Sequence, residues 1–227
     1  MAHAICYYTY RSKELSMLAY IHNLFELLAF VVAIFYYPCL KKSYMKWFLP
    51  FLGFVFIGES VEKFFNITVI VNYLIGILES FFYGYIFYQL SRRSLLKKLI
   101  LFFIPISVAG YLICFIFYGK DFSYFIPNII ITGFFLATIA LAYLYERFAD
   151  DDTLLFAEPG FWIAVGVCLF YSGVSISLSL YDFILKNDLS LFGVKLYSLT
   201  TRILSVVLYL SISISIILCK EKKRSLL

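Results

Sequence analysis

Long apolar runs constrain this chain more than any other feature of its sequence. A helix needs about 20 apolar residues to cross roughly 30 Å of hydrocarbon, and in lipid its backbone polar groups must be bonded within the helix. Such runs cover residues 17–37, 47–65, 68–90, 99–118, 125–145, 159–183 and 196–219. The sequence therefore predicts an all-α membrane protein, a compact bundle of seven transmembrane helices that forms one domain over residues 1–227.

The basic residues predict the orientation of the bundle. Lysine and arginine are enriched in the cytoplasmic loops of membrane proteins. With the N-terminus outside, the cytoplasmic segments hold Lys41, Lys42, Lys46, Arg92, Arg93, Lys97, Lys98, Arg147, Lys220, Lys222, Lys223 and Arg224, and the outer ones hold Arg11, Lys13, Lys63, Lys120, Lys186 and Lys195. We therefore expect a multi-pass protein of the bacterial inner membrane with a cytoplasmic C-terminus. Because the net charge of +5 comes from helix ends, it indicates no nucleic-acid partner.

Polar side chains embedded in the apolar runs are the candidate site. A carboxylate near the bilayer centre costs roughly 2.5–3.5 kcal/mol on insertion scales, so it needs a partner, water or a proton. At 1.5 Å per residue, nine candidates fall in the outer half of the membrane and Glu79 falls near the midplane. The nine are His22, Glu26, Glu59, Glu62, Lys63, Asn72, Asn128, Asp182 and Arg202. We expect an outward-facing polar cavity in which Glu59, Glu79 and Arg202 share one network.

Helical spacing indicates which faces meet protein. Residues three or four apart share a face of a helix. Polar or small residues follow this spacing at Asn72, Gly76, Glu79 and Tyr83, at Ser172, Ser175, Ser179 and Asp182, and at Ser198, Arg202, Ser205 and Tyr209. Gly166 and Gly173 permit close helix contact. The uncharged run 99–118 is expected at the periphery, and the second, third, sixth and seventh runs at the core.

Catalytic and cofactor-binding patterns are missing from the sequence. A zinc hydrolase needs several nitrogen or sulfur donors, but the histidines are His3 and His22 and the cysteines are scattered. A retinal pigment needs a lysine in the middle of its last helix, where this chain has Arg202. Phosphate-binding loops and nucleophile motifs do not occur. We therefore expect no enzyme, no cofactor and no metal.

The sixth run carries a recognisable segment. Residues 158–173 read EPGFWIAVGVCLFYSG. This segment resembles a P-x-F-W-x-x-x-G-x-x-x-Y-x-S-G stretch of uncharacterised seven-helix integral membrane proteins of Bacteroidota, which are similar to membrane sensor domains associated with histidine kinases. The resemblance extends loosely to the helices of Glu59 and Glu79 and to the acidic connector after residue 147. It implies a sensor class and implies no role for any residue.

Three functional hypotheses follow. The first is a sensor that binds a small ligand or cation in the outer half and signals through a separate partner, such as a histidine kinase, recruited by the acidic connector 146–158 or by helix contacts. The second is a proton- or cation-coupled transporter of small solutes, although Pro105 and Pro127 do not form the paired helix breaks typical of transporters. The third is a non-catalytic structural protein in which the buried ion pairs fix helix registry.

Overall fold

The computed structural model describes residues 16–41, 43–65, 68–118, 125–149, 155–191 and 194–224, with the backbone alone at 16–20, 62–65, 68–69, 118 and 221–224. Helices dominate the described ranges. The long ones are α1 (Ser16–Leu40), α2 (Phe48–Phe65), α3 (Thr68–Leu90), α4 (Ser94–Tyr118), α5 (Phe125–Phe148), α6 (Pro159–Ser179) and α8 (Leu196–Arg224). The short elements are the 3-10 turns η3 (Tyr44–Trp47) and η5 (Leu155–Ala157), helix α7 (Tyr181–Lys186), and strands β1 (Ser190–Leu191) and β2 (Val194–Lys195).

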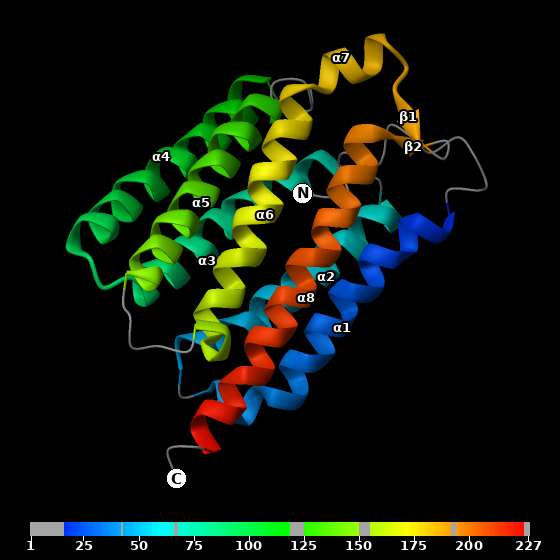
Figure 1. Cartoon of the computed structure of the whole chain (residues 1–227). Coiled ribbons are helices and arrows are strands. Elements are labelled where there is room, and N and C mark those ends of the chain that lie inside the picture. The colour runs from blue at the N-terminus through cyan, green and yellow to red at the C-terminus, as the bar shows by residue number, and fades with distance from the viewer. Residues whose placement is uncertain are drawn as a thin grey trace.

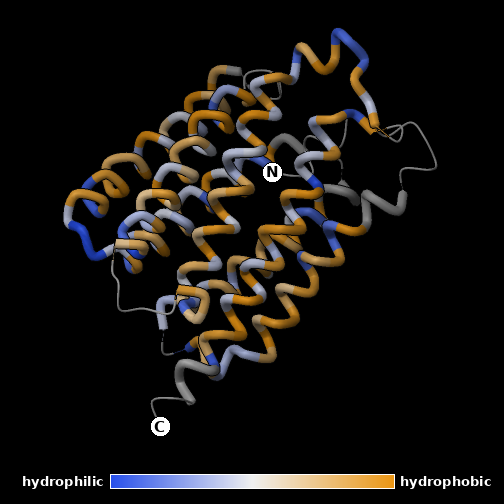
Figure 2. Tube along the Cα trace, viewed as in Figure 1, coloured by the Kyte–Doolittle hydropathy of each residue, from blue (hydrophilic) through white to orange (hydrophobic). Residues whose placement is uncertain are grey.

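Six of the long helices are apolar enough to cross a membrane: α1, α3, α4, α5, α6 and α8. Figure 2 shows apolar residues along most of each helix and hydrophilic ones gathered at the ends. The outward side chains are large and apolar; Phe102 and Phe117 of α4 are 71% and 74% exposed. Such a surface requires lipid rather than water around it. The expected all-α membrane bundle is therefore confirmed, while α2, which carries Glu59, Glu62 and Lys63, is not among the six.

The helices pack around α3 and α6. Helix α6 lies between α5 and α8, α8 packs on α1, α1 on α2, and α3 contacts α2, α4 and α5. In Figure 1, α1 and α8 run in the same direction, so residues 16 and 224 lie at opposite ends of the bundle. The Lys220 ammonium lies 5.1 Å from the Tyr36 ring centroid. Both residues lie near the C-terminal ends of their helices, α8 and α1, so the two helices run parallel.

Burial separates inner helices from peripheral ones. In the apolar window of α3, 67% of residues are buried, and in α6 61%, against 22% in α4. The expected peripheral position of the fourth run is confirmed. The expected core positions of the third and sixth runs are confirmed as well, whereas α8, the last long helix, is buried to 44%, the same share as α5. Helix α8 packs on α6 and α1. Its residues Ile203, Leu210 and Ile214, which point away from these helices, are exposed.

Several helix boundaries differ from the expected ones, and two of these differences change the connectors. Helix α4 begins at Ser94, so the basic connector shrinks to residues 91–93 and the lysines at 97 and 98 are helical. Helix α6 ends at Ser179, and the chain turns at Leu180 into α7, which projects from the bundle (Figure 1). A short antiparallel hairpin follows, with Ser190 opposite Lys195. The turn before it passes through Asp188 at φ 52°, a left-handed conformation that aspartate tolerates better than most residues.

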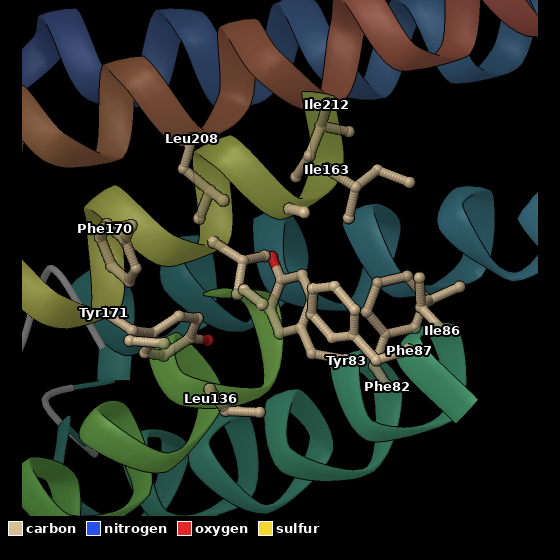
Figure 3. Packing of buried hydrophobic residues seen from close by; sticks show 14 of the residues in the cluster. Phe82, Tyr83, Ile86, Phe87, Leu136, Ile163, Phe170, Tyr171, Leu208 and Ile212 are labelled. Carbon is tan, nitrogen blue, oxygen red and sulfur yellow. The ribbon is translucent and has the colours of Figure 1, made fainter. Parts of the chain in front are cut away.

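Small residues set the spacing of the central helices. A Cβ on Gly166 of α6 would lie 2.7 Å from Cβ of Ser211 on α8, and one on Gly173 would lie 2.4 Å from Leu204 Cδ1. The expected close contact at these two glycines is confirmed, and its partner is α8. Figure 3 shows the core they bring together, with Tyr83 and Phe87 of α3 and Ile163 and Tyr171 of α6 among the labelled side chains.

Candidate functional site

Three carboxylates from three different helices are buried inside the bundle. Glu26 of α1, Glu59 of α2 and Glu79 of α3 are 1%, 4% and 7% exposed. Each of them acts electrostatically on the buried hydroxyl of Tyr209 on α8, and Glu59 also acts on Glu79. We call Glu26, Glu59 and Glu79 the acidic cluster. Burial disfavours the ionised form of each carboxylate and like charges disfavour it further, so a proton, a cation or an arginine must accompany them.

Glu79 lies among tyrosines. The hydroxyl of Tyr171 on α6 approaches its carboxyl group, and the buried tyrosines Tyr83 and Tyr111 lie close enough to interact with it electrostatically. The rings of Tyr83 and Tyr171 meet edge to face with centroids 5.6 Å apart (Figure 3). Within the described residues, Oε2 of Glu79 is buried without a hydrogen-bond donor. Such an oxygen is costly to bury in ionised form.

The polar stripes that surround the cluster face inward. Asn72, Gly76, Glu79 and Tyr83 of α3 are all buried, as are Ser198, Arg202, Ser205 and Tyr209 of α8, so these two stripes are confirmed. Gly76 is needed there because a Cβ would lie 2.8 Å from Cζ of Tyr111. His22 is buried as well. That Glu59, Glu79 and Arg202 form one network stays a prediction.

Other predicted site residues lie elsewhere. The side chains of Glu62 and Lys63 fall outside the described part of the chain. Asn128 is half-buried between α4 and α5, where its Oδ1 would lie 2.5 Å from a Cβ on Gly110. Asp182 is exposed on α7, so its expected place among the embedded groups is wrong. Helix α6 ends at Ser179, before Asp182. In the third stripe, Ser175 is therefore buried, whereas Ser179 and Asp182 are exposed.

A chain of hydroxyl groups joins α3, α4 and α5. Oγ of Ser80 lies 3.0 Å from Oγ of Ser107, which lies 3.0 Å from Oγ1 of Thr132, and all three are buried. Ser80 also donates to the carbonyl oxygen of Gly76 at 2.8 Å. The uncharged fourth run predicts a peripheral helix and does not predict this link. The available signal was Ser107, four residues before Tyr111, on the same helix face as Gly110.

A second buried polar group lies at the end of the bundle where α5 stops. Oε1 of Glu146 accepts the backbone N–H groups of Arg92 at 2.7 Å and Arg93 at 3.1 Å, and its Oε2 accepts the hydroxyl of Ser91 at 3.0 Å. Sequence reasoning assigned Glu146 to an acidic connector. In the structure it is 6% exposed and fixes the connector between α3 and α4.

The neighbouring Arg147 ties α5 to the start of α6. Its Nε donates to the Tyr143 hydroxyl at 3.2 Å and lies 3.3 Å from Oε2 of Glu158, and its guanidinium lies over the Tyr143 ring. Tyr44 of η3 is close to the same groups. Burial chiefly, with contributions from Tyr143 and Glu158, raises the pKa of Tyr44 above its usual value, so its hydroxyl stays protonated. The ion pair of Arg147 and Glu158 thus joins α5 to the start of α6 at this end of the bundle.

Within the described residues, no group of three or more His, Cys, Asp or Glu side chains could hold a metal ion. Cys39, Cys114 and Cys168 form no disulfide. No protein-family model, no curated protein and no solved structure matches the chain at a significant level.

Proposed function

We propose that this protein is a membrane sensor of the bacterial inner membrane, in which the acidic cluster binds a proton or a small cation and the bundle transmits the change to a separate partner. The proposal includes a seventh membrane span, α2, and an N-terminus outside the cell. Opposite ends for residues 16 and 224 agree with an odd number of spans. The exposed basic residues Lys41, Lys46, Arg92 and Arg93 lie in the connectors that this orientation makes cytoplasmic.

The burial of three carboxylates from three helices, those of the acidic cluster, carries the proposal. Among the described side chains of α1, α2, α3 and α8, Arg202 is the one buried lysine or arginine, against three buried carboxylates. A purely structural ion pair would need one carboxylate for that arginine. Three carboxylates buried on three helices support binding of a positive species, whose loss or gain would alter contacts among these helices. A ligand shifts a conformational equilibrium only if the two states bind it differently.

Transport is supported less well. Transporters with midplane ion sites have helices unwound at that site. Here α4 is continuous through Pro105, and Pro127 lies in the first turn of α5, where its missing N–H costs nothing. Transport therefore remains an outcome of the experiment rather than a second proposal.

The partner would be a membrane-associated signalling protein, such as a histidine kinase. The acidic connector 146–158 is one candidate surface for recruiting this partner. Its residues Glu146 and Glu158, however, bind Arg92 and Arg147 within the bundle. Residues 150–152 of that connector lie outside the described part of the chain. The exposed apolar face of α4, which includes Phe102, Ile106 and Ile113, supports recruitment by helix contacts in the membrane.

Tryptophan fluorescence tests the sensor proposal. In a Trp47→Phe background, Trp162 is the one remaining tryptophan, and it lies nine residues, about 13 Å, from Tyr171 along α6. We expect its emission in reconstituted protein to change with pH or with added Na⁺ or K⁺, and Glu79→Gln to remove the change. Asp182→Asn, which alters an exposed acid on α7, is the matched control and should keep it.

The opposite results are equally clear. Emission that is insensitive to protons and cations, or that responds equally in Glu79→Gln, would contradict the sensor proposal. Flux of a small solute into proteoliposomes, driven by an imposed proton gradient and abolished by Glu79→Gln, would establish transport instead.

A further inference from the structure

The connector between α3 and α4, residues 91–93, plays no part in the proposed function. We propose that this connector and the first turns of α4 bind the headgroup of an anionic phospholipid, and that Glu146 positions the connector for this purpose. The inference is independent of the acidic cluster.

The carboxylate of Glu146 on α5 fixes the connector by hydrogen bonds. It accepts the backbone N–H groups of Arg92 and Arg93 and the side-chain hydroxyl of Ser91, so the connector is tied to α5 by three hydrogen bonds, two of them from its backbone. The same bonds occupy the carboxylate, since both oxygens accept from the connector. The side chains of Arg92 and Arg93 are exposed above it. A cationic loop is thereby held in one conformation before any ligand arrives, which lowers the entropy cost of binding.

Aromatic rings orient the cations. The guanidinium of Arg93 lies 5.7 Å from the ring centroid of Tyr145, and the ammonium of Lys97 lies 5.3 Å from that of Tyr88. Lys98 beside them is exposed. Guanidinium groups recognise phosphate through paired hydrogen bonds, and ammonium groups add charge. Basic residues at the end of a membrane helix also attract the anionic lipids of the cytoplasmic leaflet.

The surface beside these cations favours a lipid over a soluble phosphate or an acidic protein. On the first two turns of α4, Leu95 is 69% exposed and Leu99 is 47% exposed, and Phe102 continues this apolar row. Tyr145, 67% exposed, borders the same site from α5. A ligand at this place meets cations at the helix end and aliphatic side chains along the helix. An amphiphile with a phosphate headgroup and acyl chains matches both.

Short-chain lipids make the site measurable in the full-length protein. In detergent, we expect dioctanoyl phosphatidylglycerol to raise the unfolding temperature more than dioctanoyl phosphatidylcholine does. Each lost basic residue should weaken the binding about fivefold, so Arg92→Ala/Arg93→Ala should weaken it about 25-fold. These substitutions keep the backbone donors that bind Glu146. Lys186→Ala, at the exposed end of α7, is the control and should have no effect.

Glu146→Ala separates a positioned site from a diffuse positive charge. Removing a carboxylate would strengthen anion binding if charge alone mattered, whereas loss of the positioned connector should weaken it, and we expect the weaker binding. If this variant does not fold, the arginine variants still decide. Equal responses to the two lipids, an equal response to inorganic phosphate, or binding of polyglutamate in place of phosphatidylglycerol would overturn the proposal.

Discussion

The ion pair between Arg147 and Glu158 gives a prediction whose magnitude follows from the structure. Their side chains are 10% and 15% exposed, and Nε lies 3.3 Å from Oε2. At an effective dielectric constant of about 20, two charges at this separation attract by about 5 kcal/mol. Desolvation offsets much of this attraction, but removing one partner leaves the other buried without its counter-charge, which typically costs about 3–5 kcal/mol.

We therefore expect Glu158→Leu to destabilise the protein by about 3 kcal/mol or more, while Arg147→Leu/Glu158→Leu should be close to neutral. The two single variants and the double variant form a thermodynamic cycle that isolates the coupling. Arg147→Leu also removes the bond to the Tyr143 hydroxyl, so Glu158→Leu is the cleaner single variant. Unfolding by a denaturing detergent would be followed through Trp162, four residues beyond Glu158.

An exposed ion pair provides the control. Lys195 also pairs with Asp188, but that aspartate is on the surface, so Asp188→Asn, which keeps a residue that tolerates the left-handed backbone, should leave the unfolding midpoint within error. If Glu158→Leu cost less than about 1 kcal/mol, or if the single effects simply added in the double variant, the reasoning about a stranded charge would be refuted.

Three further predictions rest on single contacts. Gly166→Leu should force α6 from Ser211 of α8 and lower stability by about 1–3 kcal/mol in thermal unfolding; an unchanged midpoint would mean that the two helices can separate freely. Ser107→Ala should cost only about 0.6 kcal/mol, the mean for hydrogen bonds between membrane helices, and a loss several times larger would assign the hydroxyl chain a greater role. Lys195 donates to Asp188 and lowers its pKa, so Lys195→Met should return that pKa to about 3.8 by NMR titration. Any stability from this pair is present above the ordinary aspartate pKa and is lost as the pH falls through the lowered one, and the variant should lack this acid dependence.

The sequence by itself predicted the six helices that are long and apolar enough to cross a membrane, and the polar faces of α3 and α8. Apolar runs near 20 residues leave little choice but a helix in lipid, because the backbone must satisfy its own hydrogen bonds. The same local rule placed Asn72 and Glu79 on one buried face, and Gly166 at a close helix contact. These features depend on residues only a few positions apart, so periodicity is sufficient to find them.

The tertiary structure decided which distant groups meet. The sequence assigns Glu146 to the acidic connector 146–158, yet its partners are residues 91–93, more than 50 positions earlier, brought to it by the packing of α3 and α4 against α5. Ser107 became a link between helices for the same reason. Asp182 matched a helical stripe but lies outside the bundle, because the chain turns at Leu180. Periodicity fixes a direction around one helix axis, whereas the position of a second helix depends on the packing of all its neighbours. Only that packing buries Glu26, Glu59 and Glu79 of three different helices in the interior of the bundle.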